Sequence, residues 1–126
     1  MGQQTRIVLI DDDQDACELL KMQLEDGNAI SVIYSTNSDD AIPLISKEQP
    51  DIAILDINMP GTHGVEIGAA LAAEKSTASI PILYLSGMVS PEEVAALMQG
   101  EDKPSIISKG SPAKDLLAAI QTLTTS

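Results

Sequence analysis

Carboxylate side chains follow two apolar runs that lie far apart in the chain. Asp56 comes directly after residues 52–55, and Asp11 and Asp12 come directly after residues 6–10. Short apolar runs bounded by turn-forming or charged residues are typical of buried β-strands. In an open α/β sheet the carboxyl ends of parallel strands meet at one edge, where such sheets build their sites. Because crowded carboxylates repel one another unless a cation neutralises them, the pattern predicts an Mg²⁺ site with a nucleophilic aspartate.

A hydroxyl and an ammonium group are predicted to lie at the same edge. Ser86 and Lys109 each follow an apolar run, at the ends of two further predicted strands. A carboxylate that attacks phosphorus produces a transition state with charge spread over three oxygens. Mg²⁺ held by Asp12 and Asp56 can bind one of these oxygens. Lys109 can pair with the second and the Ser86 hydroxyl can donate to the third, so positioning and electrostatics suffice for the chemistry.

The composition limits the class of protein. The chain of 126 residues is predicted to form one domain, residues 1–126, that buries about two-thirds of its unfolded surface. Hydrophobic residues make up 44% of it, too many for disorder, and no run reaches the ~18 apolar residues of a membrane helix. No basic start precedes an apolar stretch, so we expect no secretory signal and a cytoplasmic location.

Charge and cysteine content exclude further classes. Seven basic and nineteen acidic residues give a net charge of −12, which disfavours nucleic-acid binding because that binding needs Lys and Arg to neutralise phosphates. The simplest role of this charge is solubility. The single cysteine, Cys17, excludes an internal disulfide and a cysteine-rich zinc site, and a packing role in a helix is favoured for it.

Strand and helix patterns alternate five times along the chain. Apolar runs predict strands at residues 6–10, 30–35, 51–55, 81–85 and 105–107. Helical spacing predicts a first helix that includes residues 16–24 and ends near residues 26–28. Capping residues predict a second helix that runs to about Lys47, with Asp40 as its candidate cap, a third over about residues 65–74, and others starting near Ser90 and Ser111. Strands of near-continuous Ile, Val and Leu indicate a parallel sheet covered on both faces. Right-handed crossovers then give an α/β, doubly wound (βα)₅ fold.

The motifs at the strand ends are specific in combination. They are Leu9-Ile10-Asp11-Asp12-Asp13, Leu55-Asp56-Ile57-Asn58-Met59-Pro60-Gly61, Leu85-Ser86-Gly87 and Lys109. Over about residues 5–123 the chain resembles the receiver domain of bacterial two-component response regulators. The resemblance implies a flavodoxin-like five-stranded parallel sheet with strand order 2-1-3-4-5. It also implies a signalling domain rather than an enzyme, one that catalyses only its own phosphorylation and dephosphorylation.

The resemblance implies roles for the acidic residues. Asp56 would accept a phosphoryl group from the histidine of a partner kinase. Asp12, Asp56 and the backbone carbonyl of Asn58 would bind Mg²⁺, and Asp11 would act through water. The phosphorylated chain would then switch conformation to control a partner protein or an output domain.

The resemblance also implies roles for the hydroxyl and the lysine, and the chain departs from the family at three positions. Ser86 would be the switch residue and Lys109 the lysine that pairs with phosphate. Gly110 stands where the family usually has proline, so we expect the loop after the lysine to differ, with a trans bond. Ile106 stands where the family commonly has Tyr or Phe, so the signal path should differ. Met88 is apolar where some members guide hydrolytic water, which leaves the phosphoryl lifetime open.

The partners follow from the same resemblance. We expect phosphoryl transfer from a sensor histidine kinase or a phosphotransfer protein, and action on a downstream protein target or a covalently linked output domain. Neither direct nucleic-acid binding nor membrane association is expected of this domain. A dimer formed on phosphorylation is left open. No output domain follows Leu123, so the chain is either a single-domain regulator or a receiver from a longer protein.

Other interpretations remain as alternatives. Asp13 is expected to cap the next helix or face solvent rather than bind metal, and no role is assigned to His63 in its loop. A phosphatase of the haloacid-dehalogenase type would also use an aspartyl phosphate. Such enzymes carry Asp-x-Asp on the first strand and a cap domain, whereas this chain has Asp56-Ile57-Asn58 on the third. A receiver-like fold kept only for binding is disfavoured by the complete set of acids, hydroxyl and lysine.

Overall fold

A computed structural model describes residues 4–27, 29–57, 64–86, 106–109 and 112–124. The elements in chain order are β1 (Thr5–Ile10), α1 (Gln14–Glu25), β2 (Ile30–Ser35), the 3-10 helix η1 (Ser38–Asp40), α2 (Ala41–Glu48), β3 (Ile52–Asp56), α3 (Gly64–Ala73), β4 (Ile82–Ser86), β5 (Ile106–Ser108) and α5 (Ala113–Thr124). The helix predicted to start near Ser90 lies outside the described residues. So do Asn58, His63, Met88 and Gly110.

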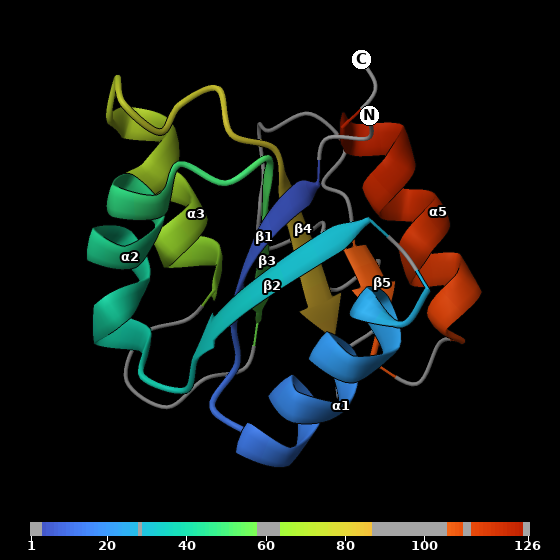
Figure 1. Cartoon of the computed structure of the whole chain (residues 1–126). Helices are drawn as coiled ribbons and strands as arrows, with labels where there is room; N and C mark the ends of the chain where they lie inside the picture. The colour runs from blue at the N-terminus through green and yellow to red at the C-terminus, as the bar shows by residue number, and fades with distance from the viewer. Residues whose placement is uncertain (1–3, 28, 58–63, 87–105, 110–111, 125–126) are drawn as a thin grey trace.

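The five strands form one parallel sheet in the order β2-β1-β3-β4-β5 (Figure 1). This confirms the predicted doubly wound fold and its strand order. β3 lies in the middle of the sheet, with β1 on one side and β4 on the other. The parallel arrangement places the carboxyl ends of all five strands at the same edge.

Helices cover both faces of the sheet. α2 and α3 lie on one face and α1 and α5 on the other (Figure 1). Alternate strand residues enter two aliphatic clusters, because successive side chains of a strand point to opposite faces. The α2/α3 side contains Val8, Ile10, Ala41, Ile45, Ala53, Leu55, Ile57, Ile67, Leu71 and Tyr84. The α1/α5 side contains Ile7, Leu9, Cys17, Leu24, Val32, Ile52, Ile54, Leu83, Leu85, Leu116 and Ile120.

Helix starts follow the capping residues of the sequence with one difference. Asp13 is the N-cap of α1 and its side chain accepts a hydrogen bond from the Ala16 amide at 3.2 Å, as predicted. Asp40 stands at the N-cap of α2 but forms no side-chain cap there. Asn37 caps the preceding turn instead, since its side chain accepts from the Asp39 amide at 2.9 Å. Because the 3-10 turn η1 precedes α2, the side-chain cap is provided by Asn37 instead of Asp40.

Three strands begin and end one residue later than predicted. The predicted third, fourth and fifth strands end at residues 55, 85 and 107, whereas β3, β4 and β5 end at Asp56, Ser86 and Ser108. Asp51 lies outside β3, where its side chain accepts from the Arg6 amide at 2.8 Å. The shift makes Asp56 and Ser86 the last residues of their strands. Their backbones are therefore held by the sheet and not by a loop.

Within the described residues, none of the helices has both the length and the apolar character that a membrane crossing requires.

Candidate functional site

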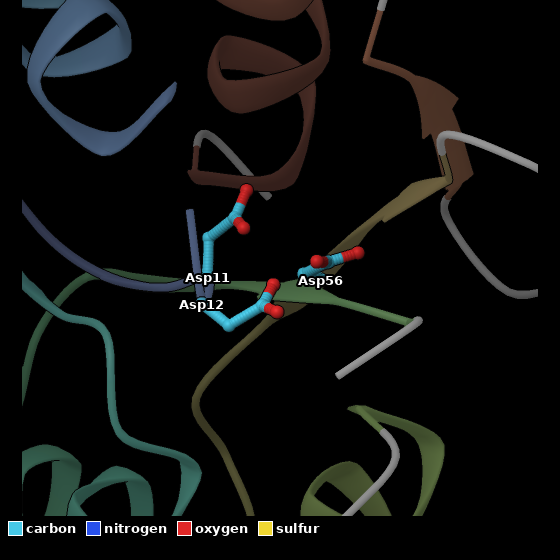
Figure 2. A group of neighbouring side chains, drawn as sticks. All are labelled: Asp11, Asp12 and Asp56. Carbon is cyan, nitrogen blue, oxygen red and sulfur yellow. The ribbon is translucent and has the colours of Figure 1, made fainter. Parts of the chain in front are cut away.

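Three carboxylates meet at the carboxyl edge of the sheet. Asp11 and Asp12 follow β1 directly, and Asp56 ends the neighbouring strand β3. The register pairs Ile10 with Leu55, so the next residues, Asp11 and Asp56, lie at the same level. One carboxylate oxygen from each aspartate lies within 4.8 Å of the others (Figure 2). The structure thus brings together all three acidic side chains that were expected to be neighbours.

The three aspartates differ in burial. Asp11 is 0% exposed and Asp56 is 2% exposed, whereas Asp12 is exposed to solvent. Burial strengthens the mutual repulsion of carboxylates because less water screens it. Solvent therefore reaches the cluster at Asp12, whereas Asp11 and Asp56 are shielded from it.

Lys109 supplies the positive charge. Its Nζ atom lies 2.8 Å from Asp11 Oδ2 and 3.1 Å from Asp56 Oδ2. The lysine is fixed by its backbone as well, because its amide donates to the Ser86 carbonyl at 3.0 Å. Burial lowers the pKa of Lys109, but the contacts with Asp11 and Asp56 outweigh it and leave the pKa above its usual value. The ammonium group therefore stays charged at neutral pH.

Asp11 is held in place by α1. Its Oδ1 atom accepts a hydrogen bond from the Asp13 amide at 3.0 Å. Its backbone carbonyl accepts from the buried Cys17 thiol at 3.2 Å. Burial, followed by the charge of Asp11, raises the pKa of Cys17 to about 12, so the thiol remains a donor. The cysteine therefore has the predicted packing role and also orients the backbone at the site.

The cluster offers carboxylate oxygens to a cation. Asp11 Oδ2 is buried, and among the described residues its partner is the Lys109 ammonium at 2.8 Å. Three carboxylates beside one lysine leave an excess of negative charge. Mg²⁺ prefers carboxylate and water oxygens and binds through few protein ligands. The donor set of Asp11, Asp12 and Asp56 fits this ion.

Ser86 stands next to the acid cluster on the adjacent strand. It is 4% exposed and ends β4, which pairs with β3 so that Leu85 lies opposite Asp56. Its carbonyl accepts from the Lys109 amide at 3.0 Å. β4 therefore lies between Lys109 and Asp56 and contacts both through its backbone.

The sequence did not point to two glycines in α3. Gly64 donates its amide to the Ile57 carbonyl at 3.3 Å, and a Cβ atom there would lie 3.0 Å from the Asp56 carbonyl carbon. One turn later, a Cβ atom at Gly68 would lie 3.1 Å from Tyr84 Cζ, with the hydroxyl closer still. A larger residue at Gly64 would push α3 away from the end of β3, and one at Gly68 would push it away from β4. A glycine directly before the predicted helix at 65–74 was the available signal.

Comparison with known proteins identifies the family. A family sequence model described as "Response regulator receiver domain" matches residues 7–121. The chain belongs to this family. Receiver domains are signalling modules of two-component systems, which agrees with the resemblance drawn from the strand-end motifs.

Curated relatives of this receiver domain are longer proteins. The response regulator MprA of Mycolicibacterium vanbaalenii is 34% identical over 120 residues, which cover 94% of this chain and 49% of the relative. An uncharacterised response regulatory protein of Yersinia pestis is 37% identical over 70 residues, 55% of this chain and 29% of the relative. The matched segments span half or less of the length of these relatives.

Solved structures support the same fold for this receiver domain. A response regulator from Desulfuromonas acetoxidans is 29% identical, with a TM-score of 0.79 and 94% of each chain covered. The chemotaxis response regulator CheY4 of Vibrio cholerae is 23% identical, with a TM-score of 0.82 and 96% of this chain and 99% of that chain covered. The second likeness shows the fold alone.

Proposed function

We propose that this receiver domain, residues 1–126, accepts a phosphoryl group on Asp56 in an Mg²⁺-dependent reaction and switches conformation as a result. The observation that supports this most directly is the cluster of Asp11, Asp12 and Asp56, in which the Lys109 ammonium contacts Asp11 and Asp56. A structural role would not need three carboxylates at one point, because their repulsion costs free energy.

Asp56 is the proposed nucleophile. One of its carboxylate oxygens forms a bond to phosphorus while the bond from phosphorus to the donor's nitrogen or oxygen breaks, and the leaving group takes that electron pair. Mg²⁺, when bound, would neutralise charge on the carboxylates and on the incoming phosphoryl group. Asp11 and Asp12 would hold the ion. Asn58, the further ligand that the resemblance implies, lies outside the described residues.

Lys109 and Ser86 are the proposed partners of the phosphoryl oxygens. Lys109 already lies 3.1 Å from Asp56 Oδ2, so its ammonium can move from the carboxylate to a phosphoryl oxygen with little change of position. The raised pKa of Lys109 keeps the ammonium charged during this exchange. Ser86 is buried beside Asp56 on β4, and its hydroxyl would donate to another oxygen once the phosphoryl group is present. Such donors stabilise the charge that is spread over the phosphoryl oxygens.

The proposed phosphoryl donor is a sensor histidine kinase or a phosphotransfer protein in the cytoplasm. The phosphorylated domain would act on a downstream protein or on a linked output domain. Control of an output domain fits the greater length of the curated relatives, of which this chain spans half or less. The domain would catalyse only its own phosphorylation and dephosphorylation.

Intact-mass spectrometry after treatment with acetyl phosphate and Mg²⁺ tests this function. The wild-type chain should gain one phosphoryl group, and Asp56→Asn should gain none because the amide lacks the attacking negative charge. Asp13→Asn is the matched control. It makes the same chemical change beside the cluster, but Asp13 caps α1 and is not the proposed acceptor, so labelling should persist.

Two results would contradict the proposal. One is wild-type labelling of the Asp56→Asn variant. The other is continuous turnover of a phosphomonoester, which would indicate a phosphatase with an aspartyl-phosphate intermediate rather than a receiver. Removal of Mg²⁺ by EDTA should abolish the labelling of the wild-type chain.

A further inference from the structure

β2 is an edge strand with one open side. Among the described residues, β2 pairs with β1 alone and stands at the end of the sheet order. Residues 29 and 35 use their carbonyls toward β1, by accepting from the Thr5 and Asp11 amides at 2.8 and 3.2 Å. In a parallel ladder the groups of alternate residues face alternate sides, so Ile30, Val32 and Tyr34 direct their backbone groups outward. Val32 is the middle residue of this open edge.

Two side chains of α1 occupy both outward backbone groups of Val32. The Val32 amide donates to Glu25 Oε2 at 2.8 Å, and the Val32 carbonyl accepts from Lys21 Nζ at 2.7 Å. Lys21 and Glu25 also form an ion pair at 2.8 Å, one helical turn apart in α1. Lys21, Glu25 and the Val32 backbone are therefore each bonded to the other two. The hydrogen bond from Lys21, followed by that from the Val32 amide, lowers the pKa of Glu25, so the carboxylate stays charged at neutral pH.

The sequence of β2 makes an open edge hazardous. Residues 30–35 read Ile-Ser-Val-Ile-Tyr-Ser, with no charged residue and no proline. Uncharged segments of this length with high β-propensity pair readily with identical segments. Ile33 adds an exposed apolar side chain, 38% accessible, on the same strand. Natural proteins protect such edges with charged side chains.

We propose that the Lys21–Glu25 pair is a lock that prevents a second copy of this chain from adding its β2 to the edge of the sheet. A strand added there would need the outward groups of Val32, and it would meet both charged side chains. A second copy is the expected occupant of the unlocked edge, because it presents the same uncharged segment. The lock acts on β2, whereas the proposed phosphoryl chemistry involves residues at the carboxyl ends of β1, β3 and β4 and after β5, so the two can be tested separately.

The double variant Lys21→Ala with Glu25→Ala tests the lock in the full chain. Amide exchange at Val32, followed by NMR, should become at least about tenfold faster, because a hydrogen bond to a charged group is lost. Analytical ultracentrifugation should show association that grows with protein concentration. The matched control is Glu74→Ala with Lys75→Ala, which removes the same two charges from exposed positions after α3. The control should behave as the wild-type chain in both measurements.

A third substitution shows whether the association uses β2. Ile33→Lys, added to the double variant, places a charge on the edge and should restore the wild-type sedimentation. The proposal is overturned if amide exchange at Val32 is unchanged in the double variant or if that variant does not associate. It is also overturned if Ile33→Lys fails to reverse the association. Should the double variant not fold, Lys21→Met gives the sedimentation comparison alone, because it removes the bond to the Val32 carbonyl and the ion pair while the Val32 amide keeps its bond to Glu25. In either variant, phosphoryl labelling of Asp56 tests the proposed function separately.

Discussion

The same two strands, β1 and β3, carry a group of charged residues at each end, and the two groups differ in how well their charges are matched. At the amino end, the Arg6 side chain donates to the Glu48 carbonyl at 2.7 Å and to Glu48 Oε1 at 2.8 Å. The Arg6 amide donates to Asp51 Oδ2 at 2.8 Å, and the Arg6 carbonyl accepts from the Asp51 amide at the same distance. Every charged side chain of this amino-end group has a hydrogen-bond partner.

The carboxyl-end group contains Asp11, Asp12, Asp56 and Lys109, three acids with one base. Two of its acids are buried, whereas the Arg6 side chain is 47% exposed. Asp11 and Asp56 share the same Lys109 ammonium, at 2.8 and 3.1 Å. Three acids beside one base leave an excess of negative charge in this carboxyl-end group.

The difference separates a structural from a functional arrangement. Exposed ion pairs such as Arg6–Glu48 contribute little to stability, typically about 0–1 kcal/mol. Buried like charges destabilise the fold, and proteins retain them mainly where a function requires them. An imbalance of buried charge is thus a better guide to function than the number of charged residues, since both groups contain several. The predictions below test this contrast.

The largest effect is expected when the single base of the carboxyl-end group is removed. In EDTA, Lys109→Met should lower the free energy of unfolding by about 2–3 kcal/mol, because it leaves buried carboxylates without a counter-charge. The loss is less than for a fully buried pair because the Lys109 side chain is 28% exposed. Arg6→Met is the matched control at the amino end and should cost about 1 kcal/mol. Urea unfolding followed by circular dichroism measures both.

Mg²⁺ sharpens this first test. A divalent cation should restore part of the stability of Lys109→Met and none of that of Arg6→Met, because only the carboxyl-end group offers an oxygen cluster. Equal losses in the two variants, with no response to Mg²⁺, would show that the two ends of the sheet are alike.

Ser86→Ala should weaken the switch without preventing phosphorylation. The hydroxyl would bond to a charged phosphoryl oxygen, so its loss should destabilise the phosphorylated conformation by about 1.5–3 kcal/mol. This is as large as a typical allosteric coupling free energy, about 1–3 kcal/mol. With Ile106 in place of an aromatic residue, Ser86 should carry a large share of the coupling. NMR shifts on addition of beryllium fluoride, a phosphoryl mimic, measure the change, and equal shifts in variant and wild type would contradict it.

The sequence predicted the sheet and the acid cluster for a clear physical reason. Parallel strands are buried on both faces, so they appear as uninterrupted apolar runs, and the residues after them must lie at one edge. Asp13 was expected to cap α1, and it does, because capping depends on residues three positions apart. Strand ends were less predictable. Whether a strand stops at Leu55 or Asp56 depends on the hydrogen bonds of its neighbours, here the bond from the Ile57 amide to the Leu85 carbonyl.

The contacts that the sequence did not reveal join residues far apart in the chain. Arg6 and Asp51 are separated by 45 positions, and no local pattern links them. The same holds for the close approach of Gly68 to Tyr84 and for the bonds from Lys21 and Glu25 to the edge of β2. Lys109 was expected to pair with phosphate, but its position between Asp11 and Asp56 became apparent only from the folded arrangement.

Magnesium should stabilise the wild-type chain through the carboxyl-end group alone. At about ten times its dissociation constant, a ligand that binds only the folded state raises the free energy of unfolding by about 1.4 kcal/mol. Asp12→Asn should lose most of this gain, because it removes the exposed ligand. Asp51→Asn should retain all of it. Thermal unfolding with and without Mg²⁺ measures this stabilisation in each variant. A stabilisation by Mg²⁺ that persists in Asp12→Asn would contradict the proposed ligand set.

The smallest predicted effect is a difference in sign between one substitution in the carboxyl-end group and one in the amino-end group. In EDTA, Asp56→Asn should raise the free energy of unfolding by about 0.5–1 kcal/mol, because removing one of three neighbouring negative charges relieves repulsion. Asp51→Asn makes the same chemical change at the amino end of the same strand. It should lower the stability by about 0.5 kcal/mol, because a neutral amide is a weaker acceptor for the Arg6 amide than a carboxylate. Urea titrations of both variants, at one pH and salt concentration, give the two signs. If both substitutions destabilise the chain, Asp56 is held by favourable contacts and the carboxyl-end group carries no stored repulsion.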